Sequence, residues 1–170
     1  MGQAFAKRLA GFGCKVIFYD KYKDFKSQCD SGCLKGGWTP SQVTLATLQA
    51  EADVVSFHVP LTEETRHYFD DRFAESMAKP FFLVNTSRGA VVDTVALAAA
   101  LENGKVRGAA LDVLEYEDMT KDGLASAPQP MRYLMQSPRT VLTPHVAGWT
   151  AESKYKLAAV LADKMIETLK

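Results

Sequence analysis

The fold is decided by residues 81–114, FFLVNTSRGAVVDTVALAAALENGKVRGAALDVL. The run FFLVNT at 81–86 is short and apolar, as is typical of a strand buried in a parallel sheet. Asp93 is a good helix N-cap, and the stretch after it predicts a helix that Gly104 ends. The run GAALDVL at 108–114 predicts a second strand, with Asp112 inside it. Strand, helix and strand in this order favour a right-handed parallel crossover.

The same alternation continues on both sides of this unit. The patterns predict helices at 2–10, 41–52 (capped by Ser41), 70–78 and 150–169 (capped by Thr150), and strands at 15–19, 53–59 and 140–143. The strands do not alternate in polarity, so we expect them to be covered on both faces. A doubly wound sheet normally opens with its central strand, whereas this sequence begins inside a helix. We therefore expect that this sequence lacks the first strand of the sheet, which would precede Met1.

Composition excludes several classes of protein. The chain has 170 residues, 20 basic and 20 acidic side chains, a formal net charge of zero and 47% hydrophobic residues. These values disfavour intrinsic disorder, and the length disfavours a complete (β/α)₈ barrel. No apolar run reaches the length of a membrane span, and the N-terminus lacks the features of a signal peptide. The neutral balance gives no electrostatic basis for binding nucleic acid or an anionic membrane.

The odd number and the spacing of the three cysteines, Cys14, Cys29 and Cys33, do not suggest a disulfide framework. Cys29 and Cys33 could supply half of a zinc site, but no second pair of ligands follows. We expect reduced thiols, no metal and a cytoplasmic location. The proline-containing segment 115–139 predicts an irregular connection, and connections of that length are often functional.

Five short stretches, in this order, resemble one family of enzymes over nearly the whole chain. They are Gly2-Gln3-Ala4-Phe5-Ala6 with Asp20, His58-Val59-Pro60-Leu61-Thr62, Asn85-Thr86-Ser87-Arg88-Gly89, Asp112-Val113-Leu114-Glu115-Tyr116-Glu117 and Thr143-Pro144-His145. Together they resemble the nucleotide-binding domain of the D-isomer-specific 2-hydroxyacid dehydrogenases, and the phosphoglycerate dehydrogenase branch is the most similar.

The resemblance implies a Rossmann-type doubly wound sheet and a division of the chain into two parts. Residues 1–149 correspond to a nucleotide-binding domain that starts within the family's G-x-G-x-x-G fingerprint, with Gly2 as its third glycine. Residues 150–170 correspond to a helix that leads back toward a separate substrate domain. That domain and the first two glycines are expected to lie outside this sequence.

Asp20 is the candidate for recognising the adenosine ribose. It lies 18 residues after Gly2, which is the spacing of the acid that hydrogen-bonds the ribose hydroxyls. Its charge would repel a 2′-phosphate, so NAD is favoured over NADP, although Lys21 and Lys23 weaken that preference. The alternative is a solvated aspartate at the end of a strand.

Other cofactor contacts follow from the resemblance alone. It implies that Val59 and Pro60 pack beside the adenine and that Thr65 lies near the pyrophosphate or ribose. It also implies that Asp112 lies near the nicotinamide carboxamide, with a buried structural aspartate as the alternative, and that Gly148 lets the backbone approach the nicotinamide. Thr86 and Ser87, which precede Arg88, are counted with the cofactor-binding residues.

Arg88, Glu117 and His145 are the candidate catalytic residues. Arg88 offers a planar fork that can bind a carboxylate through two hydrogen bonds, and its alternative is a surface salt bridge. Histidine is suited to proton exchange near neutral pH, and a carboxylate beside it would orient the ring. The family implies that His145 and Glu117 form the acid/base unit, with Glu115 as a competing partner, and that Arg88 and His145 also border the cofactor. His58 is expected to be structural.

The resemblance implies an NAD-dependent oxidoreductase that acts on small 2-hydroxy or 2-oxo acids and assembles as a homodimer. We expect the 170-residue chain to be inactive alone, because the family recognises the substrate side chain largely with the other domain. The alternative is an NAD(H)-sensing or protein-binding module on the same fold, like the family's transcriptional corepressors.

Overall fold

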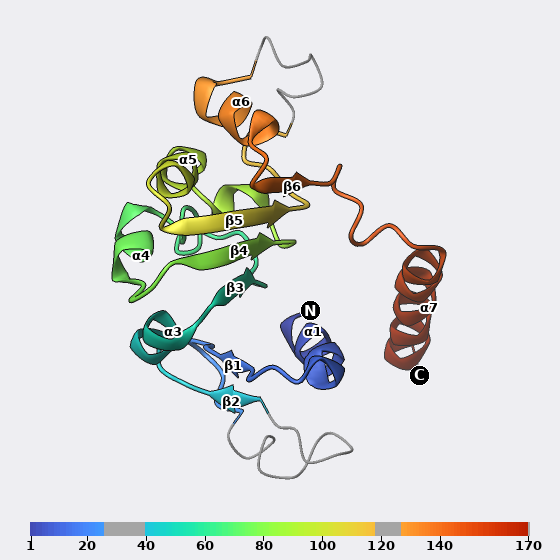
Figure 1. Ribbon diagram of the computed structural model, residues 1–170. Coiled ribbons are helices and arrows are strands. Elements are labelled where there is room, and N and C mark those ends of the chain that lie inside the picture. Colours follow the sequence, from blue (N-terminus) through green and yellow to red (C-terminus); the bar gives the residue numbers. More distant parts are fainter. Residues whose placement is uncertain (26–39, 118–126, 170) are drawn as a thin grey trace.

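The computed structural model describes residues 1–25, 40–117 and 127–169, which form an α/β arrangement with two parallel sheets (Figure 1). The four-stranded sheet has the order β3-β4-β5-β6, made of Val54–Phe57, Phe81–Asn85, Val106–Leu111 and Thr140–Leu142. The two-stranded sheet pairs β1, Ile17–Phe18, with β2, Ser41–Gln42. The parallel α/β class predicted from the alternation of strands and helices is confirmed.

The strands of the larger sheet are in register at their carboxyl ends. Asn85 on β4 lies beside Leu111 on β5, which lies beside Leu142 on β6. The segments that follow these three strands therefore begin next to one another at one edge of the sheet. Open parallel sheets bind their ligands at this edge.

Helices connect the strands of the larger sheet in sequence. α4, Asp71–Ser76, lies between β3 and β4, α5, Thr94–Glu102, between β4 and β5, and α6, Gln129–Gln136, before β6. The predicted cap of α5 is confirmed, because Asp93 accepts hydrogen bonds from the amides of Val95 and Ala96 at 2.8 and 3.1 Å. Gly104 follows the helix with φ of +80°, a conformation that favours glycine.

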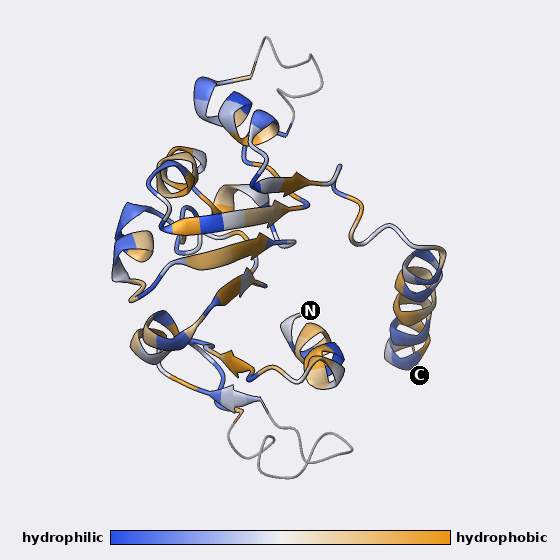
Figure 2. Ribbon diagram, viewed as in Figure 1, coloured by the Kyte–Doolittle hydropathy of each residue, from blue (hydrophilic) through white to orange (hydrophobic). Residues whose placement is uncertain are grey.

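The hydrophobic core covers one face of the larger sheet. Phe81 and Leu83 of β4 are fully buried together with Leu97 and Leu101 of α5. On the other face 45% of the Phe82 surface is exposed, and the exposed fractions of Val54 and Val141 are larger still. The expectation that the strands are covered on both faces therefore holds for one face only. Figure 2 shows the apolar character of β3 and β4, which is typical of strands covered on both faces even though one face here is exposed.

Two local predictions were wrong. The helix expected to start at Ser41 starts later, because Ser41 belongs to β2 and Thr44 caps α3, Leu45–Glu51. The segment 115–139 is not wholly irregular, because it contains α6. Pro130 lies in the first turn of α6, where the missing N–H has no helical partner to lose.

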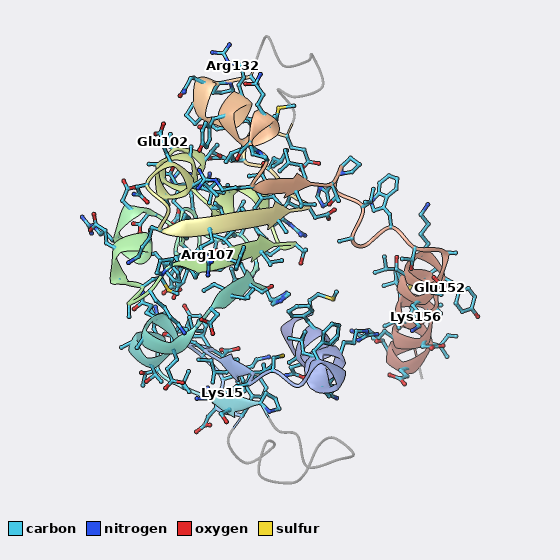
Figure 3. All side chains as sticks on the ribbon, viewed as in Figure 1. Lys15, Glu102, Arg107, Arg132, Glu152 and Lys156 are labelled. Atoms are coloured by element: carbon cyan, nitrogen blue, oxygen red, sulfur yellow. The ribbon has the colours of Figure 1, made fainter. Side chains whose placement is uncertain are left out.

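Neither terminal helix contains a buried residue. α1, Gly2–Arg8, continues as a 3-10 turn at Leu9–Phe12 and ends before Gly13, which has φ of +66°. α7, Ala151–Thr168, has the predicted Thr150 cap, in a capping box with Ser153, but none of its residues is buried. It stands apart from the sheet in Figure 1, and its side chains, such as those of Glu152 and Lys156 in Figure 3, surround a solvated helix. In the described part of the chain, no helix is long and apolar enough to cross a membrane.

Candidate active site

The three candidate catalytic residues follow three neighbouring strands. Arg88 follows β4, Glu117 follows β5 and His145 follows β6. The register of the strands brings the segments that carry them to the same edge of the sheet. Residues far apart in sequence are thus assembled by the fold at the edge where ligands bind.

His145 and Glu117 form a hydrogen-bonded pair. The Nδ1 atom of His145 lies 2.9 Å from Oε1 and 3.1 Å from Oε2 of Glu117. A carboxylate only accepts hydrogen bonds, so Nδ1 carries the hydrogen when the ring is neutral. Nε2 then keeps an available lone pair, and both side chains remain more than 40% exposed. This arrangement can accept a proton at Nε2 while the carboxylate stabilises the resulting cation.

Asp112 holds the turn that carries His145. It lies just after β5, not inside the strand as expected, and it is buried. Oδ1 accepts hydrogen bonds from the Thr143 hydroxyl at 2.5 Å and the Val146 amide at 2.9 Å, and Oδ2 accepts one from the Ala147 amide at 3.0 Å. Burial alone would raise the pKa of Asp112. These hydrogen bonds and the charge of His145 outweigh burial and hold that pKa below its usual value.

Three hydrogen bonds committed to one turn favour the structural alternative for Asp112. The turn places His145 at φ of +54°, a conformation that non-glycine residues rarely adopt. Such a residue persists where its surroundings over-determine it, and Asp112 supplies that constraint. A contact with the nicotinamide carboxamide remains a proposal.

Hydrogen bonds made by the Asn85 side chain hold the loop that carries Arg88. The fully buried Asn85 side chain donates to the Arg88 carbonyl at 2.9 Å and accepts from the Ser87 hydroxyl at 2.7 Å. Gly89 packs so tightly that an added Cβ would lie 2.0 Å from the Leu114 carbonyl oxygen. The loop is therefore fixed while Arg88 itself is exposed and donates to the Ser87 carbonyl at 2.6 Å. An exposed guanidinium on a fixed loop can receive a carboxylate.

Glu115, the competing partner for His145, instead pairs with His67. Its Oε1 lies 2.5 Å from Nε2 of His67, and its Oε2 accepts from the Thr94 amide at 3.0 Å. Burial alone would raise the pKa of Glu115, but hydrogen bonds from Thr94 and His67 outweigh it and hold that pKa below its usual value. No local pattern could have identified His67, because its partner lies 48 positions away.

Asp20 has one carboxylate oxygen committed to its own turn. Oδ1 accepts hydrogen bonds from the amides of Tyr22 and Lys23, both at 2.9 Å. Each carboxylate oxygen can accept more than one hydrogen bond, so this arrangement leaves Asp20 able to bind ribose hydroxyls. Lys21 forms an ion pair with Glu64, and the Tyr22 hydroxyl donates to the same carboxylate. That pairing reduces the ability of Lys21 to offset the charge of Asp20.

The structure assigns local roles to several other candidates. Gly2 is the first residue of α1 and lies close to His58, because an added Cβ would be 3.3 Å from the His58 Cβ. The Thr65 hydroxyl donates to the Pro60 carbonyl at 2.5 Å and accepts from the Thr62 amide at 2.8 Å, so it closes the turn after β3. The pKa of His58 is lowered by burial and by the positive N-terminus, which disfavours its charged form.

The remaining cofactor candidates differ in their surroundings. Val59 packs against the core, and Thr86 is exposed at the end of β4. The Ser87 hydroxyl is engaged by Asn85. An added Cβ on Gly148 would meet no atom within 4 Å, so no close approach by another part of the described chain requires glycine there.

No metal site emerges from the part of the chain that the structure describes. No group of three or more histidine, cysteine, aspartate or glutamate side chains there could hold an ion. Cys14 is exposed, and its thiol donates to the Leu9 carbonyl at 4.0 Å. Cys29 and Cys33 lie outside the described residues.

Comparison with known proteins identifies a matching family. Residues 1–147 match the family model described as "D-isomer specific 2-hydroxyacid dehydrogenase, NAD binding domain". The chain is 36% identical over 177 aligned residues to a glyoxylate reductase of Thermofilum pendens, covering 100% of this chain and 46% of the relative. It is 35% identical over 169 aligned residues to a hydroxypyruvate reductase of Thermotoga maritima, covering 99% and 50%. The chain thus spans about half the length of these curated relatives.

Solved structures show the same fold. The NAD-complexed D-isomer specific 2-hydroxyacid dehydrogenase from Lactobacillus delbrueckii ssp. bulgaricus superimposes with a TM-score of 0.82 at 30% identity, covering 98% of this chain and 49% of that chain. A D-lactate dehydrogenase from Aquifex aeolicus, complexed with NAD and lactic acid, gives 0.78 at 29% identity, covering 98% and 50%. The predicted Rossmann-type class is confirmed at the level of the fold.

Proposed function

This chain belongs to the D-isomer specific 2-hydroxyacid dehydrogenase family, and we propose that it supplies the NAD-binding and acid/base part of an enzyme that interconverts D-2-hydroxy acids and 2-oxo acids. The observation that carries the proposal is the His145–Glu117 pair, at the same sheet edge as the Arg88 loop. The names glyoxylate reductase and hydroxypyruvate reductase among the relatives favour a small 2-oxo acid as substrate.

His145 is the proton acceptor of the proposed reaction. During oxidation of the hydroxy acid, its Nε2 accepts the C2 hydroxyl proton as the C2 hydride leaves, and the product is the 2-oxo acid. Glu117 holds the ring through Nδ1 and stabilises the imidazolium that forms. In the reverse direction the same imidazolium returns the proton to the carbonyl oxygen. Arg88 binds the substrate carboxylate, which fixes C2 relative to His145.

The described residues fit a nicotinamide dinucleotide. Asp20 follows β1 and can bind the adenosine ribose, and Val59 and Pro60 follow β3 at the carboxyl ends of the strands. Arg88 and His145 are at the same edge of the sheet, further along the strand order. When bound, the nicotinamide supplies the hydride acceptor. The pairing of Lys21 with Glu64 supports NAD over NADP.

Four narrower expectations accompany the proposal. They are a specificity like that of phosphoglycerate dehydrogenases, inactivity of the 170-residue chain alone, a homodimer and a cytoplasmic location. The first three rest on the family resemblance. The fourth rests on the sequence expectation of reduced thiols.

Titration of the purified chain with NADH tests the cofactor site first. We expect saturable binding, followed through nicotinamide emission, and weaker binding by the variant Asp20→Ala. Asp163→Ala is the matched control, because Asp163 is an exposed aspartate on α7. Equal affinity of the two variants would remove Asp20 from the site. A folded chain that does not bind NADH at millimolar concentration would contradict the proposal that it binds the cofactor unaided.

Turnover is tested in a chimera with a known relative. This chain replaces the matching half of the T. maritima hydroxypyruvate reductase, and NADH oxidation by hydroxypyruvate is followed. We expect His145→Gln to lower kcat by roughly 10²–10⁴-fold, as for loss of a general base. Arg88→Lys should raise KM by roughly 10–100-fold, because the two-pronged carboxylate contact is lost.

Arg107→Lys is the control for the arginine substitution. Arg107 lies on β5, over the ring of Phe82 at 5.6 Å (Figure 3). The substitution Arg107→Lys should leave kcat and KM unchanged. An active chimera whose kcat is unchanged by His145→Gln would refute the assigned base. NADH binding without any turnover would favour the alternative, a nucleotide-sensing module.

A further inference from the structure

His67 and Glu115 lie beside the candidate catalytic residues but have no part in the proposed proton transfer. Both ring nitrogens of His67 face carboxylates: Nε2 lies 2.5 Å from Glu115 and Nδ1 lies 3.6 Å from Asp93. Only 13% of the Glu115 side chain is exposed. Burying a charged group is costly unless it is paired, so a carboxylate this buried needs partners held in fixed positions.

His67 adopts a conformation that its surroundings impose. Its φ is +51°, and in the described chain it shares a positive φ among non-glycine residues only with His145. Its amide donates to the Ala90 carbonyl at 2.8 Å, and the Phe69 amide donates to the Val91 carbonyl at 3.0 Å. The segment around His67 is therefore joined to the residues that directly follow Arg88.

Glu115 connects the same region to the segment that carries Glu117. Its second oxygen accepts the Thr94 amide at the start of α5. Gly89 packs directly on the peptide between Leu114 and Glu115. Two residues later, Glu117 meets His145. The position of Glu115 thus constrains the Arg88 loop on one side and the Glu117 carboxylate on the other.

We propose that His67 and Glu115 form a positioning bridge that holds the Arg88 loop and the Glu117–His145 pair in register with each other. Neither residue touches the substrate in this proposal. Asp93 provides the second support, because it faces the other nitrogen of His67 and caps α5. The inference rests on the proposed function for its consequence, but the geometry it describes is a property of the chain alone.

The tautomer of His145 reports whether the bridge positions Glu117. Two-bond ¹H–¹⁵N spectra of the labelled chain distinguish a ring that carries its hydrogen on Nδ1 from one that carries it on Nε2. The chain has three histidines, and the spectrum of His145→Gln assigns the relevant signals. At a pH where the rings are neutral, we expect the Nδ1–H form of His145, because Glu117 accepts that hydrogen.

Removal of the bridge should shift this equilibrium. His67→Gly removes the ring but tolerates the positive φ, and Glu115→Gln removes the charge but keeps the shape. Each should lower the ratio of Nδ1–H to Nε2–H in His145 by about tenfold, the scale of one charge-assisted hydrogen bond. His67→Gln keeps a donor of similar reach and should restore most of the ratio.

A control and a contrary result make the test decisive. His58→Gln removes a different part-buried histidine, one hydrogen-bonded to Ser56, and should leave the His145 ratio unchanged. If His67→Gly does not fold, Glu115→Gln and His67→Gln still carry the comparison. An unchanged ratio in folded Glu115→Gln, or an equal change in His58→Gln, would overturn the proposal. The readout needs neither cofactor nor turnover, so its failure is distinct from failure of the proposed function.

Discussion

Asp112→Asn should release the turn that presents His145. The carboxylate accepts three hydrogen bonds, from the Thr143 hydroxyl and the Val146 and Ala147 amides. Asparagine keeps one acceptor oxygen, which can retain the two bonds now made to Oδ1. Its NH₂ group then faces the Ala147 amide, so two donors oppose each other and one charge-assisted bond is lost.

The expected cost follows from these contacts. Loss of a hydrogen bond to a charged group costs about 1.5–3 kcal/mol, and the two retained bonds become weaker when the acceptor is neutral. A local destabilisation of about 3 kcal/mol raises the equilibrium population of the open turn roughly 10²-fold, and amide exchange speeds up in proportion. Amide hydrogen exchange at Val146 and Ala147 measures it directly. Asp163→Asn, on the solvated helix α7, is the matched control and should change neither rate.

The pH dependence of the Asp112→Asn effect provides a second check. The folded-state pKa of Asp112 lies below its ordinary value of 3.8, because the hydrogen bonds and His145 outweigh burial. A group with a depressed folded pKa stabilises the fold above its unfolded pKa, and the stabilisation is lost as pH falls through the folded value. The difference between wild type and Asp112→Asn should therefore be full at neutral pH and shrink below 3.8. Unchanged exchange at neutral pH would refute the assignment of Asp112 to the turn.

Three further outcomes are expected. Gly89→Ala should destabilise the chain by about 3 kcal/mol in urea unfolding, because its Cβ would meet the Leu114 carbonyl, whereas Gly11→Ala, in open space, should cost little. Asp93→Ala should lower stability by about 1 kcal/mol through loss of the α5 cap, measured in the same way. The stabilising effect of Glu115 over Glu115→Gln should be present at neutral pH and fade below 4.5, since its folded pKa is lowered; an effect that persists in acid would contradict this.

Sequence was sufficient for elements whose signals are local. Asp93 and Thr150 were predicted as caps because an N-cap side chain bonds amides within three residues, and both do so. The run at 81–86 was recognised because a buried strand is apolar over consecutive residues. It ends one residue earlier than predicted, at Asn85. These signals do not depend on what the element packs against.

Elements that depend on tertiary contacts were less predictable. The prolines before and within the first turn of α6 were interpreted as signs of an irregular loop. They are compatible with a helix because Met131 and Leu134 bury its apolar side against the core. Exposure of Val54 and Phe82 could not be predicted either, since nothing in an apolar run says which face of a strand is covered.

The sequence also predicts one part of the candidate site, the His145–Glu117 pair, but not the contacts of His67. The family resemblance implies the pairing of His145 with Glu117, and the structure brings these two side chains together. The choice between Glu115 and Glu117 depended on the resemblance, and the geometry explains it, because Glu115 is committed to His67. The role of His67 could not be inferred, because it arises from a contact across the fold.

The catalytic and adenosine-binding candidates rest on different sheets. Arg88, Glu117 and His145 follow strands of the four-stranded sheet, whereas Asp20 follows β1, whose strand pairing in the described chain is with β2. Side-chain contacts join the N-terminal part of the chain to the segment after β3. The ring of Phe5 is tilted against that of His58, with centroids 5.2 Å apart. Lys21 and Tyr22 both contact the Glu64 carboxylate. The acid/base geometry can therefore be set within the larger sheet. Affinity for a dinucleotide that spans both sheets depends instead on how firmly these contacts hold the smaller sheet in place, so substitutions far from His145 can weaken cofactor binding while leaving the proton-transfer pair intact.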